Sequence, residues 1–248
     1  MKLLLDIGNS SVNWAVEEQE QLVTTGAFSY KKNNLEQELQ EKFSLFEKPA
    51  EVLVSNVAGG EVVNTLSDWV NKQWQQTLWQ PYVSSHFKEL KNSYRFPLKM
   101  GLDRWLAMIA SWEQYETALC LVGCGTALTI DVIDSGGEHL GGYIVPGIEL
   151  MQKALINSTE QINVVVNNIA SLDYAKDTDT AVNNGAFLAA VSMIDRVADI
   201  FSNEQQCKVK YIISGGMAEL IKPLLKHPYE YKANLVLSGL SILYRASR

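Results

Sequence analysis

Cysteine and histidine are both scarce in this sequence, with three of each among 248 residues. Cys120, Cys124 and Cys207 form no C-x-x-C pair, which argues against a zinc site and against a disulfide framework. The histidines are far apart and form no metal-ligand motif, so we expect each to be structural or exposed. Reduced thiols of this kind indicate a cytoplasmic protein.

Long apolar runs and basic clusters are also missing. Asp6 interrupts the apolar start after Leu3, Leu4 and Leu5, so this run is too short for a signal peptide, and no other stretch approaches a membrane span. The formal net charge is −7, with 21 basic and 28 acidic residues. We therefore expect neither nucleic acid nor a membrane as a partner, because both attract clustered lysine and arginine.

Two phosphate-binding signatures are absent as well. The chain contains neither G-x-x-x-x-G-K-[ST] nor G-x-G-x-x-G, which argues against a P-loop enzyme and against a dinucleotide enzyme. What is present is ordinary for a globular protein, with 47% apolar and 20% charged residues. The length suits one large domain or two small ones.

The first half of the chain predicts strands followed by helices. A polar turn over 6–11 breaks the opening apolar stretch, and its Gly8 and Asn9 tolerate positive φ, so strand, turn and strand is the simplest interpretation. Hydrophobic spacing then predicts, in order, a strand near 26–30, a helix over 34–46, a strand over 51–54 and a helix over 62–74.

The second half repeats this opening. Superposing Asp6 on Gly123 places Gly8 on Gly125 and Asn9 on Thr126. The remaining pattern predicts a strand at 121–122, a return strand over 127–133, a third strand after a turn at 136–137, a helix from 148, a long helix over 178–201, a strand over 211–213 and a final segment over 233–244.

The β-β-β-α-β-α order, found twice, predicts an α/β fold of a specific kind. We expect two ribonuclease-H-like (actin-like ATPase) domains in tandem, residues 1–116 and 117–248, with a nucleotide cleft between them. A single doubly wound α/β domain is the alternative.

Three glycine turns are candidates for contact with a nucleotide. In Asp6-x-Gly8-Asn9-Ser10, backbone N–H groups can approach phosphate oxygens, and a carboxylate at the strand end can hold Mg²⁺ through water. Gly123-Cys124-Gly125-Thr126 is the counterpart, with a hydroxyl on Thr126. Ser214-Gly215-Gly216 follows a strand, where a base and ribose can lie near the backbone. Each turn alone would also fit an ordinary connection.

A further motif, Gly101-Leu102-Asp103-Arg104, precedes a helix predicted over about 102–112. Asp103 falls in the first turn of this helix, where a carboxylate can act chemically or can serve only as a partner of the helix dipole. Arg104 can bind a carboxylate through two parallel hydrogen bonds, although a surface ion pair is the plainer interpretation.

Taken in order, these motifs resemble the type III pantothenate kinases over nearly the whole chain. The resemblance is carried by Asp6-x-Gly8-Asn9-Ser10, Gly101-x-Asp103-Arg104, Gly125-Thr126-Ala127-x-Thr129-x-Asp131, Gly142-x-Ile144-x-Pro146-Gly147, Thr178-x-x-Ala181-x-x-x-Gly185 and Gly215-Gly216-x-Ala218. It implies a homodimeric enzyme that phosphorylates pantothenate with ATP in the first step of coenzyme A synthesis.

The resemblance also implies roles for individual residues. Asp103 would be the general base, and Thr178 would reach the substrate across the dimer. The other pantothenate contacts would be Tyr94, Gly101, Leu102 and Arg104. The ATP contacts would be Asp6, Ile7, Gly8, Asn9, Ser10, Ser11, Val12, Asn13, Gly125 and Thr126, together with Gly215 and Gly216, and Asp6 would lie near Mg²⁺.

Two positions depart from the family. Gly123 stands where the family usually has an aspartate that binds a monovalent cation, K⁺ or NH₄⁺, so such a site would rest on backbone carbonyls or water, or be lost. Asn13 stands where some members carry a lysine. Two other functions stay open: a kinase of this fold acting on a sugar or short acid, and a nucleotide-binding regulatory protein without turnover. Cys124 is expected to be a small packing residue.

Overall fold

The computed structural model describes residues 1–31, 34–158 and 169–248. Backbone contacts divide the chain into two compact units, and we describe each by itself. Unit 1 contains residues 1–85, 94–110 and 234–248, and unit 2 contains residues 86–93 and 111–233. The units interleave along the sequence, whereas the predicted domains 1–116 and 117–248 are continuous segments. That division stays a prediction.

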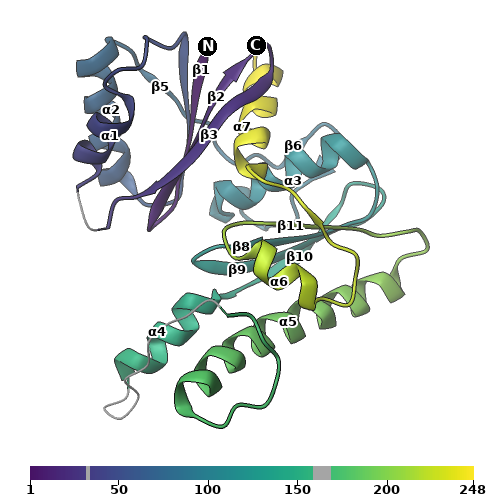
Figure 1. Cartoon of the computed structure of the whole chain (residues 1–248). Coiled ribbons are helices and arrows are strands. Elements are labelled where there is room, and N and C mark those ends of the chain that lie inside the picture. The colour runs from purple at the N-terminus through teal and green to yellow at the C-terminus, as the bar shows by residue number, and fades with distance from the viewer. Residues whose placement is uncertain (32–33, 159–168) are drawn as a thin grey trace. The chain divides into compact units, whose positions relative to one another are not determined.

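Unit 1 is built on a five-stranded mixed sheet with the order β3-β2-β1-β4-β5 (Figure 1). Its strands are β1 (Lys2–Ile7), β2 (Ser11–Glu18), β3 (Gln21–Ser29), β4 (Glu51–Asn56) and β5 (Leu78–Trp79). β1 and β3 are antiparallel to β2, while β4 is parallel to β1 and β5 is parallel to β4. The carboxyl ends of β1 and β4 therefore meet at one edge, with Asp6 opposite Ser55.

Helices cover both faces of this sheet. α1 (Leu35–Phe43) and α2 (Gly60–Trp74) bury one face, where Leu3, Leu5 and Ile7 of β1 pack with aromatic residues such as Phe43 and Trp69. α7 (Leu235–Ala246) packs on β1 and β4 from the other side (Figure 1). Because both faces are covered, β1 is a continuous apolar run and not an alternating one.

Unit 2 contains a second five-stranded sheet with the equivalent order β10-β9-β8-β11-β12. Its strands are β8 (Leu119–Cys124), β9 (Ala127–Ile133), β10 (His139–Pro146), β11 (Lys210–Ser214) and β12 (Glu230–Tyr231). The senses match those of unit 1, since β8 and β10 are antiparallel to β9 while β11 is parallel to β8 and β12 is parallel to β11. This repeated topology confirms the predicted pair of ribonuclease-H-like domains.

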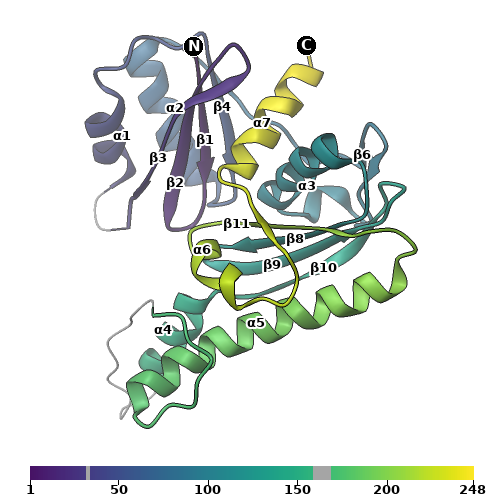
Figure 2. The ribbon, with the colours of Figure 1, turned by 45° about the vertical axis from the view of Figure 1, so that its right-hand side comes forward.

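A long helix covers the sheet of unit 2. α5 (Thr178–Glu204) inserts Phe187, Ile194 and Phe201 into a core shared with Val122, Ile130 and Ile213. Figure 2 shows α5 running along this sheet, with α4 (Ile148–Ser158) beside its first half. Unit 2 also contains the short pieces α6 (Ala218–Ile221), η2 (Lys222–Leu224), β6 (His86–Phe87) and β7 (Leu90–Lys91).

The remaining segment carries the motif around Asp103. The 3₁₀ turn η1 (Pro97–Lys99) leads into α3 (Leu102–Tyr115), whose residues up to 110 belong to unit 1. The helix predicted from 102 is therefore confirmed and is one turn longer than expected. No helix among the described residues has the length and apolar character needed to cross a membrane.

Gly8 and Gly125 both lie in the turn between the first two strands of their sheets, as the expected superposition requires, although their turn hydrogen bonds span different numbers of residues. The Gly8 N–H donates to the Ser11 carbonyl at 3.0 Å, and the Gly125 N–H donates to the Ala127 carbonyl at 3.1 Å. The turns differ in length, because β2 begins at Ser11 and β9 begins at Ala127. β5, β12, β6 and β7 were not predicted, since two-residue strands carry no periodicity that a sequence pattern can detect.

Candidate active site

The turn between β1 and β2 is held by the end of β3. The Tyr30 hydroxyl donates to the Gly8 carbonyl at 2.6 Å, and Ser29 Oγ donates to the Ser10 carbonyl at 3.1 Å. The Gly8 N–H donates to the Ser11 carbonyl and so closes the turn with a backbone hydrogen bond. The sequence identified this turn as a candidate phosphate site, but it gave no indication of Tyr30 or Ser29, because side chains that reach across strand pairs leave no local pattern.

Asp6 lies at the carboxyl end of β1, directly beneath this turn. Its Oδ1 is buried and lacks a hydrogen-bond partner among the described residues, while Asn13 Nδ2 donates to Oδ2 at a long 3.4 Å. Burial raises the pKa of Asp6 to about 6, and the negative charge of Asp103 adds to this rise. Asn13 and Ser55 both lie near the carboxylate and oppose this rise in the pKa of Asp6. The Ser55 hydroxyl, however, does not meet the geometry of a hydrogen bond to Asp6.

The structure thus brings Asp6 and Asp103 together within unit 1. An enclosed, unsatisfied carboxylate oxygen with a second carboxylate nearby favours a cation. Mg²⁺ commonly uses one or two carboxylates and completes its shell with water and substrate phosphates. The residues present therefore fit the predicted metal. The described part of the chain contains no cluster of three or more acidic, histidine or cysteine ligands that would form a cage.

The conformation of the Asp103 side chain depends on Gly101, two residues earlier in the chain. A Cβ at Gly101 would lie 2.5 Å from Asp103 Oδ1, so only glycine lets the carboxylate fold back at the start of α3. Oδ1 also accepts the N–H of Arg104 at 2.9 Å. The first turn of α3 is closed by the N–H of Trp105, which donates to the Gly101 carbonyl at 3.1 Å.

Arg104 and Tyr94 form the other part of this cluster. Arg104 is 6% exposed, and its Nη1 donates to the Tyr94 hydroxyl at 2.7 Å. The guanidinium carbon lies 5.6 Å from the centre of the Tyr94 ring. Four predicted substrate residues, Tyr94, Gly101, Leu102 and Arg104, therefore gather around Asp103 in unit 1.

The second candidate turn, between β8 and β9, is surrounded by backbone. The Gly147 N–H donates to the Thr126 carbonyl at 2.9 Å, and the Met217 N–H donates to the Cys124 carbonyl at 3.2 Å. A Cβ at Gly147 would collide with the Gly125 carbonyl, and a Cβ at Gly215 would collide with that of Cys124. Three glycine motifs that are far apart in sequence thus meet within unit 2, and Cys124 is buried.

Asp131, whose role the sequence did not indicate, belongs to a buried polar network in unit 2. His139 Nε2 lies 3.0 Å from Asp131 Oδ1, and its Nδ1 lies 3.2 Å from Ser93 Oγ. The His139 side chain is completely buried. The network joins β9 and β10 to residue 93, a connection between distant segments that sequence spacing does not reveal.

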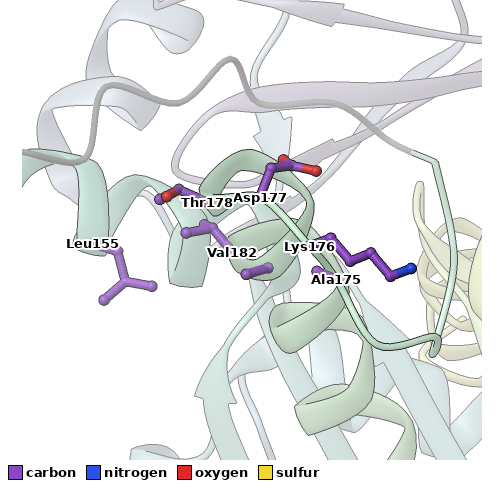
Figure 3. Close-up of a pocket in the computed structure, with 7 residues that line it drawn as sticks. Leu155, Ala175, Lys176, Asp177, Thr178 and Val182 are labelled. Atoms are coloured by element: carbon purple, nitrogen blue, oxygen red, sulfur yellow. The ribbon is translucent and has the colours of Figure 1, made fainter.

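Thr178 belongs to unit 2. It lines a groove of about 610 Å³ together with Leu155, Ala175, Lys176, Asp177, Ala181 and Val182 (Figure 3). Asp177 caps α5, because its carboxylate accepts the N–H and the hydroxyl of Thr180, both at 2.8 Å. These hydrogen bonds lower the pKa of Asp177. The groove offers apolar walls and one ammonium group.

Comparison with known proteins agrees with these features. The family model for the type III pantothenate kinases matches residues 2–199. A protein of Nitrosococcus oceani named type III pantothenate kinase is 36% identical, over 97% of this chain and 92% of its own.

Two solved structures share the fold. A Campylobacter jejuni protein described as a Baf family transcriptional activator has a TM-score of 0.63 at 21% identity, covering 99% of this chain and 98% of its own. A Sinorhizobium meliloti protein described as a 2-dehydro-3-deoxygalactonokinase has a TM-score of 0.60 at 12% identity, covering 100% of this chain and 99% of its own. At these identities the likeness concerns the fold alone. The extent of the family match, together with the relative at 36% identity, shows that the chain belongs to the type III pantothenate kinase family.

Proposed function

We propose that this protein is a pantothenate kinase, which transfers the γ-phosphoryl group of ATP to the hydroxyl of pantothenate and forms 4'-phosphopantothenate, the first step of coenzyme A biosynthesis. The observation that carries this proposal is that Asp6 and Asp103 both lie in unit 1, near enough for the charge of Asp103 to raise the pKa of Asp6, in a chain that belongs to this family. We assign Asp6 to the metal and the phosphates, and Asp103 to the acceptor alcohol.

Asp103 is the proposed general base. The hydroxyl oxygen of pantothenate attacks the γ-phosphorus, the bond between that phosphorus and the bridging oxygen breaks, and ADP leaves. The hydroxyl proton passes to the Asp103 carboxylate. A carboxylate suffices for this step, because in a loose transition state the proton leaves late and positioning supplies much of the rate.

The ATP phosphates are assigned to the two glycine turns, residues 6–13 and 125–126, and the base and ribose to Gly215 and Gly216. Backbone N–H groups in such turns bind phosphate oxygens without interference from a Cβ. Mg²⁺, when bound, would neutralise charge on the phosphates, and Asp6 is the residue that would hold it, through water. Its unsatisfied Oδ1 supports this assignment.

Arg104 and Tyr94 are proposed to orient pantothenate. Pantothenate carries a carboxylate, and a buried guanidinium already held by a tyrosine hydroxyl is suited to bind one. Thr178 is proposed as a further contact, supplied across a dimer. The cytoplasm is the proposed location, in keeping with three unpaired cysteines, of which only Cys207 is exposed.

A side-chain site for a monovalent cation is not proposed at position 123. A Cβ at Gly123 would lie 2.6 Å from Thr129 Oγ1, so the Thr129 hydroxyl occupies the space that an aspartate would need. Any K⁺ or NH₄⁺ would have to use backbone carbonyls or water. Turnover should be compared in Na⁺ and K⁺ buffers: equal turnover would show that the cation site is lost, and a strong K⁺ requirement would show that other ligands compensate for the missing side chain.

A homodimer is proposed because unit 2 exposes apolar side chains on three neighbouring elements. They include Tyr143 and Ile144 on β10, Leu150 and Leu155 on α4, and Leu188 on α5. β10 is also the edge of its sheet, and exposed edge strands favour pairing with another chain.

The proposed function is tested by ADP release in the presence of pantothenate and of a panel of sugars and short acids. We expect turnover with pantothenate and a loss of roughly 100-fold or more in kcat for Asp103→Asn. Asp68→Asn, an exposed carboxylate on α2, is the matched control and should keep full activity.

Three outcomes would contradict parts of the proposal. Activity of Asp103→Asn within a few-fold of the parent would remove Asp103 as the base. Turnover of a sugar or short acid in place of pantothenate would indicate the other kinase function. ATP binding without any turnover would indicate the regulatory protein.

A further inference from the structure

We infer that Tyr30 and Ser29, at the end of β3, are positioning residues that orient the N–H groups of the first phosphate-binding turn. Neither residue belongs to a motif that identified the family. The inference rests on the proposed function, because it assumes that this turn binds the phosphates of ATP.

Both side chains contact the turn through its carbonyls. Ser29 is the register partner of Ser11, so the end of β3 lies directly beside residues 8–10. The Tyr30 hydroxyl donates to the Gly8 carbonyl at 2.6 Å, and the Ser29 hydroxyl donates to the Ser10 carbonyl at 3.1 Å. Two of the peptide groups in this turn are therefore tied to the same strand end.

Fixing a carbonyl also fixes the N–H of the same peptide group. The described chain contains no cis peptide bond, and in a trans peptide the C=O and the following N–H point in opposite directions. When Tyr30 holds the Gly8 carbonyl toward β3, the N–H of Asn9 must point away from β3. Ser29 does the same for the N–H of Ser11 through the Ser10 carbonyl.

This arrangement matters because a turn containing glycine is otherwise free to reorient. A phosphate site works best when its donors already face the ligand, since ordering them during binding reduces affinity. Tyr30 is suited to the task because its ring has few rotatable bonds. Burial raises the pKa of its hydroxyl, which keeps the hydroxyl protonated as a donor.

The prediction is tested with Tyr30→Phe and Ser29→Ala by measuring the binding of AMP, ADP and a nonhydrolysable ATP analogue with Mg²⁺ by calorimetry. Loss of one hydrogen bond to the turn should weaken binding of the ATP analogue by about 5- to 10-fold. AMP, which lacks the β- and γ-phosphates, should bind as it does to the parent. A purely structural role would not produce this dependence on phosphate number.

Matched controls separate the effect from a general loss of stability. Tyr82→Phe removes a hydroxyl from an exposed tyrosine of unit 1 and should change nothing. Ser29→Thr retains the hydroxyl and should restore binding. In steady-state assays, KM for ATP should rise while KM for pantothenate and the melting temperature stay close to the parent values.

Two results would overturn the inference. Unchanged affinity of Tyr30→Phe for the ATP analogue would show that the turn is oriented without this contact. An equal loss for AMP, ADP and the ATP analogue would show that Tyr30 supports the unit as a whole. Failure of the proposed function is distinguishable, because then the parent protein itself would bind no ATP analogue or would not turn over pantothenate.

Discussion

Asp6 is a buried carboxylate whose ionisation in the folded protein is unfavourable. Its pKa in the folded protein is about 6, above the ordinary value of 3.8, because burial and Asp103 disfavour the ionised form. A raised carboxyl pKa means that the folded state binds the proton more tightly than the unfolded state does. The protonated Asp6 carboxyl therefore makes its full contribution to the free energy of unfolding at pH values below about 4, and this contribution is lost as the pH rises through 6.

We predict that Asp6→Asn stabilises the protein at pH 8, by roughly 1 to 3 kcal/mol, and has little effect near pH 4. The amide is neutral at both pH values, so it avoids the burial of a charge. Urea denaturation without Mg²⁺ or nucleotide measures this difference, with Asp68→Asn as the exposed control. Equal stability of the variant and the parent at pH 8 would contradict the raised pKa. The same variant should lose kinase activity, since it removes the proposed metal ligand.

At the scale of elements, the close contact between α7 and α3 is the main feature of unit 1. Gly239 of α7 faces the backbone of α3, and a Cβ there would collide with the carbonyl of Leu106. Both positions belong to unit 1, so this contact joins the C-terminal helix to the helix that carries Asp103. Helix propensity disfavours glycine inside a helix. Glycine is needed at this position because the backbones of α7 and α3 lie too close together for a Cβ.

Gly239→Ala is predicted to destabilise the protein by about 1 to 3 kcal/mol, because the added methyl group forces α7 and α3 apart. Gly185→Ala is a matched control in the interior of α5, where a Cβ would meet no atom within 4 Å. There the gain in helix propensity should leave stability unchanged or raise it by about 1 kcal/mol. Thermal unfolding compares the two, and similar effects at both positions would show that α7 does not pack tightly on α3.

At the scale of the whole molecule, the exposed apolar side chains of β10, α4 and α5 predict an assembly of two chains. Light scattering should give about twice the chain mass of 27.7 kDa at micromolar concentration. Leu188→Glu and Leu155→Glu should weaken the dimer, because a buried unpaired carboxylate is costly. Leu45→Glu, at an equally apolar but 97% exposed position in unit 1, should not. A parent protein that stays monomeric would contradict the proposed interface.

The same comparison tests whether the dimer matters for catalysis. If Thr178 contacts the substrate of a second chain, the interface variants should lose affinity for pantothenate as they dissociate, while their binding of the ATP analogue should remain. Loss of both affinities together would instead indicate damage to unit 2.

The sequence by itself determined the architecture and the family, and it nominated candidate site residues. Glycine turns after apolar strands, repeated in two halves, were sufficient to predict the duplicated fold, because strand periodicity and turn chemistry are local properties. The ordered motifs were sufficient to indicate the family and to nominate Asp6, Asp103 and Arg104. The boundaries of β9 and the start of α4 also agreed with the structure.

The tertiary structure decided what depends on contacts between distant segments. It joined α7 to the sheet of unit 1 and paired Asp131 with His139. It placed the Thr129 hydroxyl where a side chain at position 123 would lie. It also brought the side chains of Tyr30 and Ser29 into contact with the turn that contains Gly8. None of these leaves a local pattern, because hydrogen bonding and steric fit arise only when folding brings the residues together. Burial likewise raised the pKa of Asp6, since desolvation depends on every segment that surrounds the carboxylate.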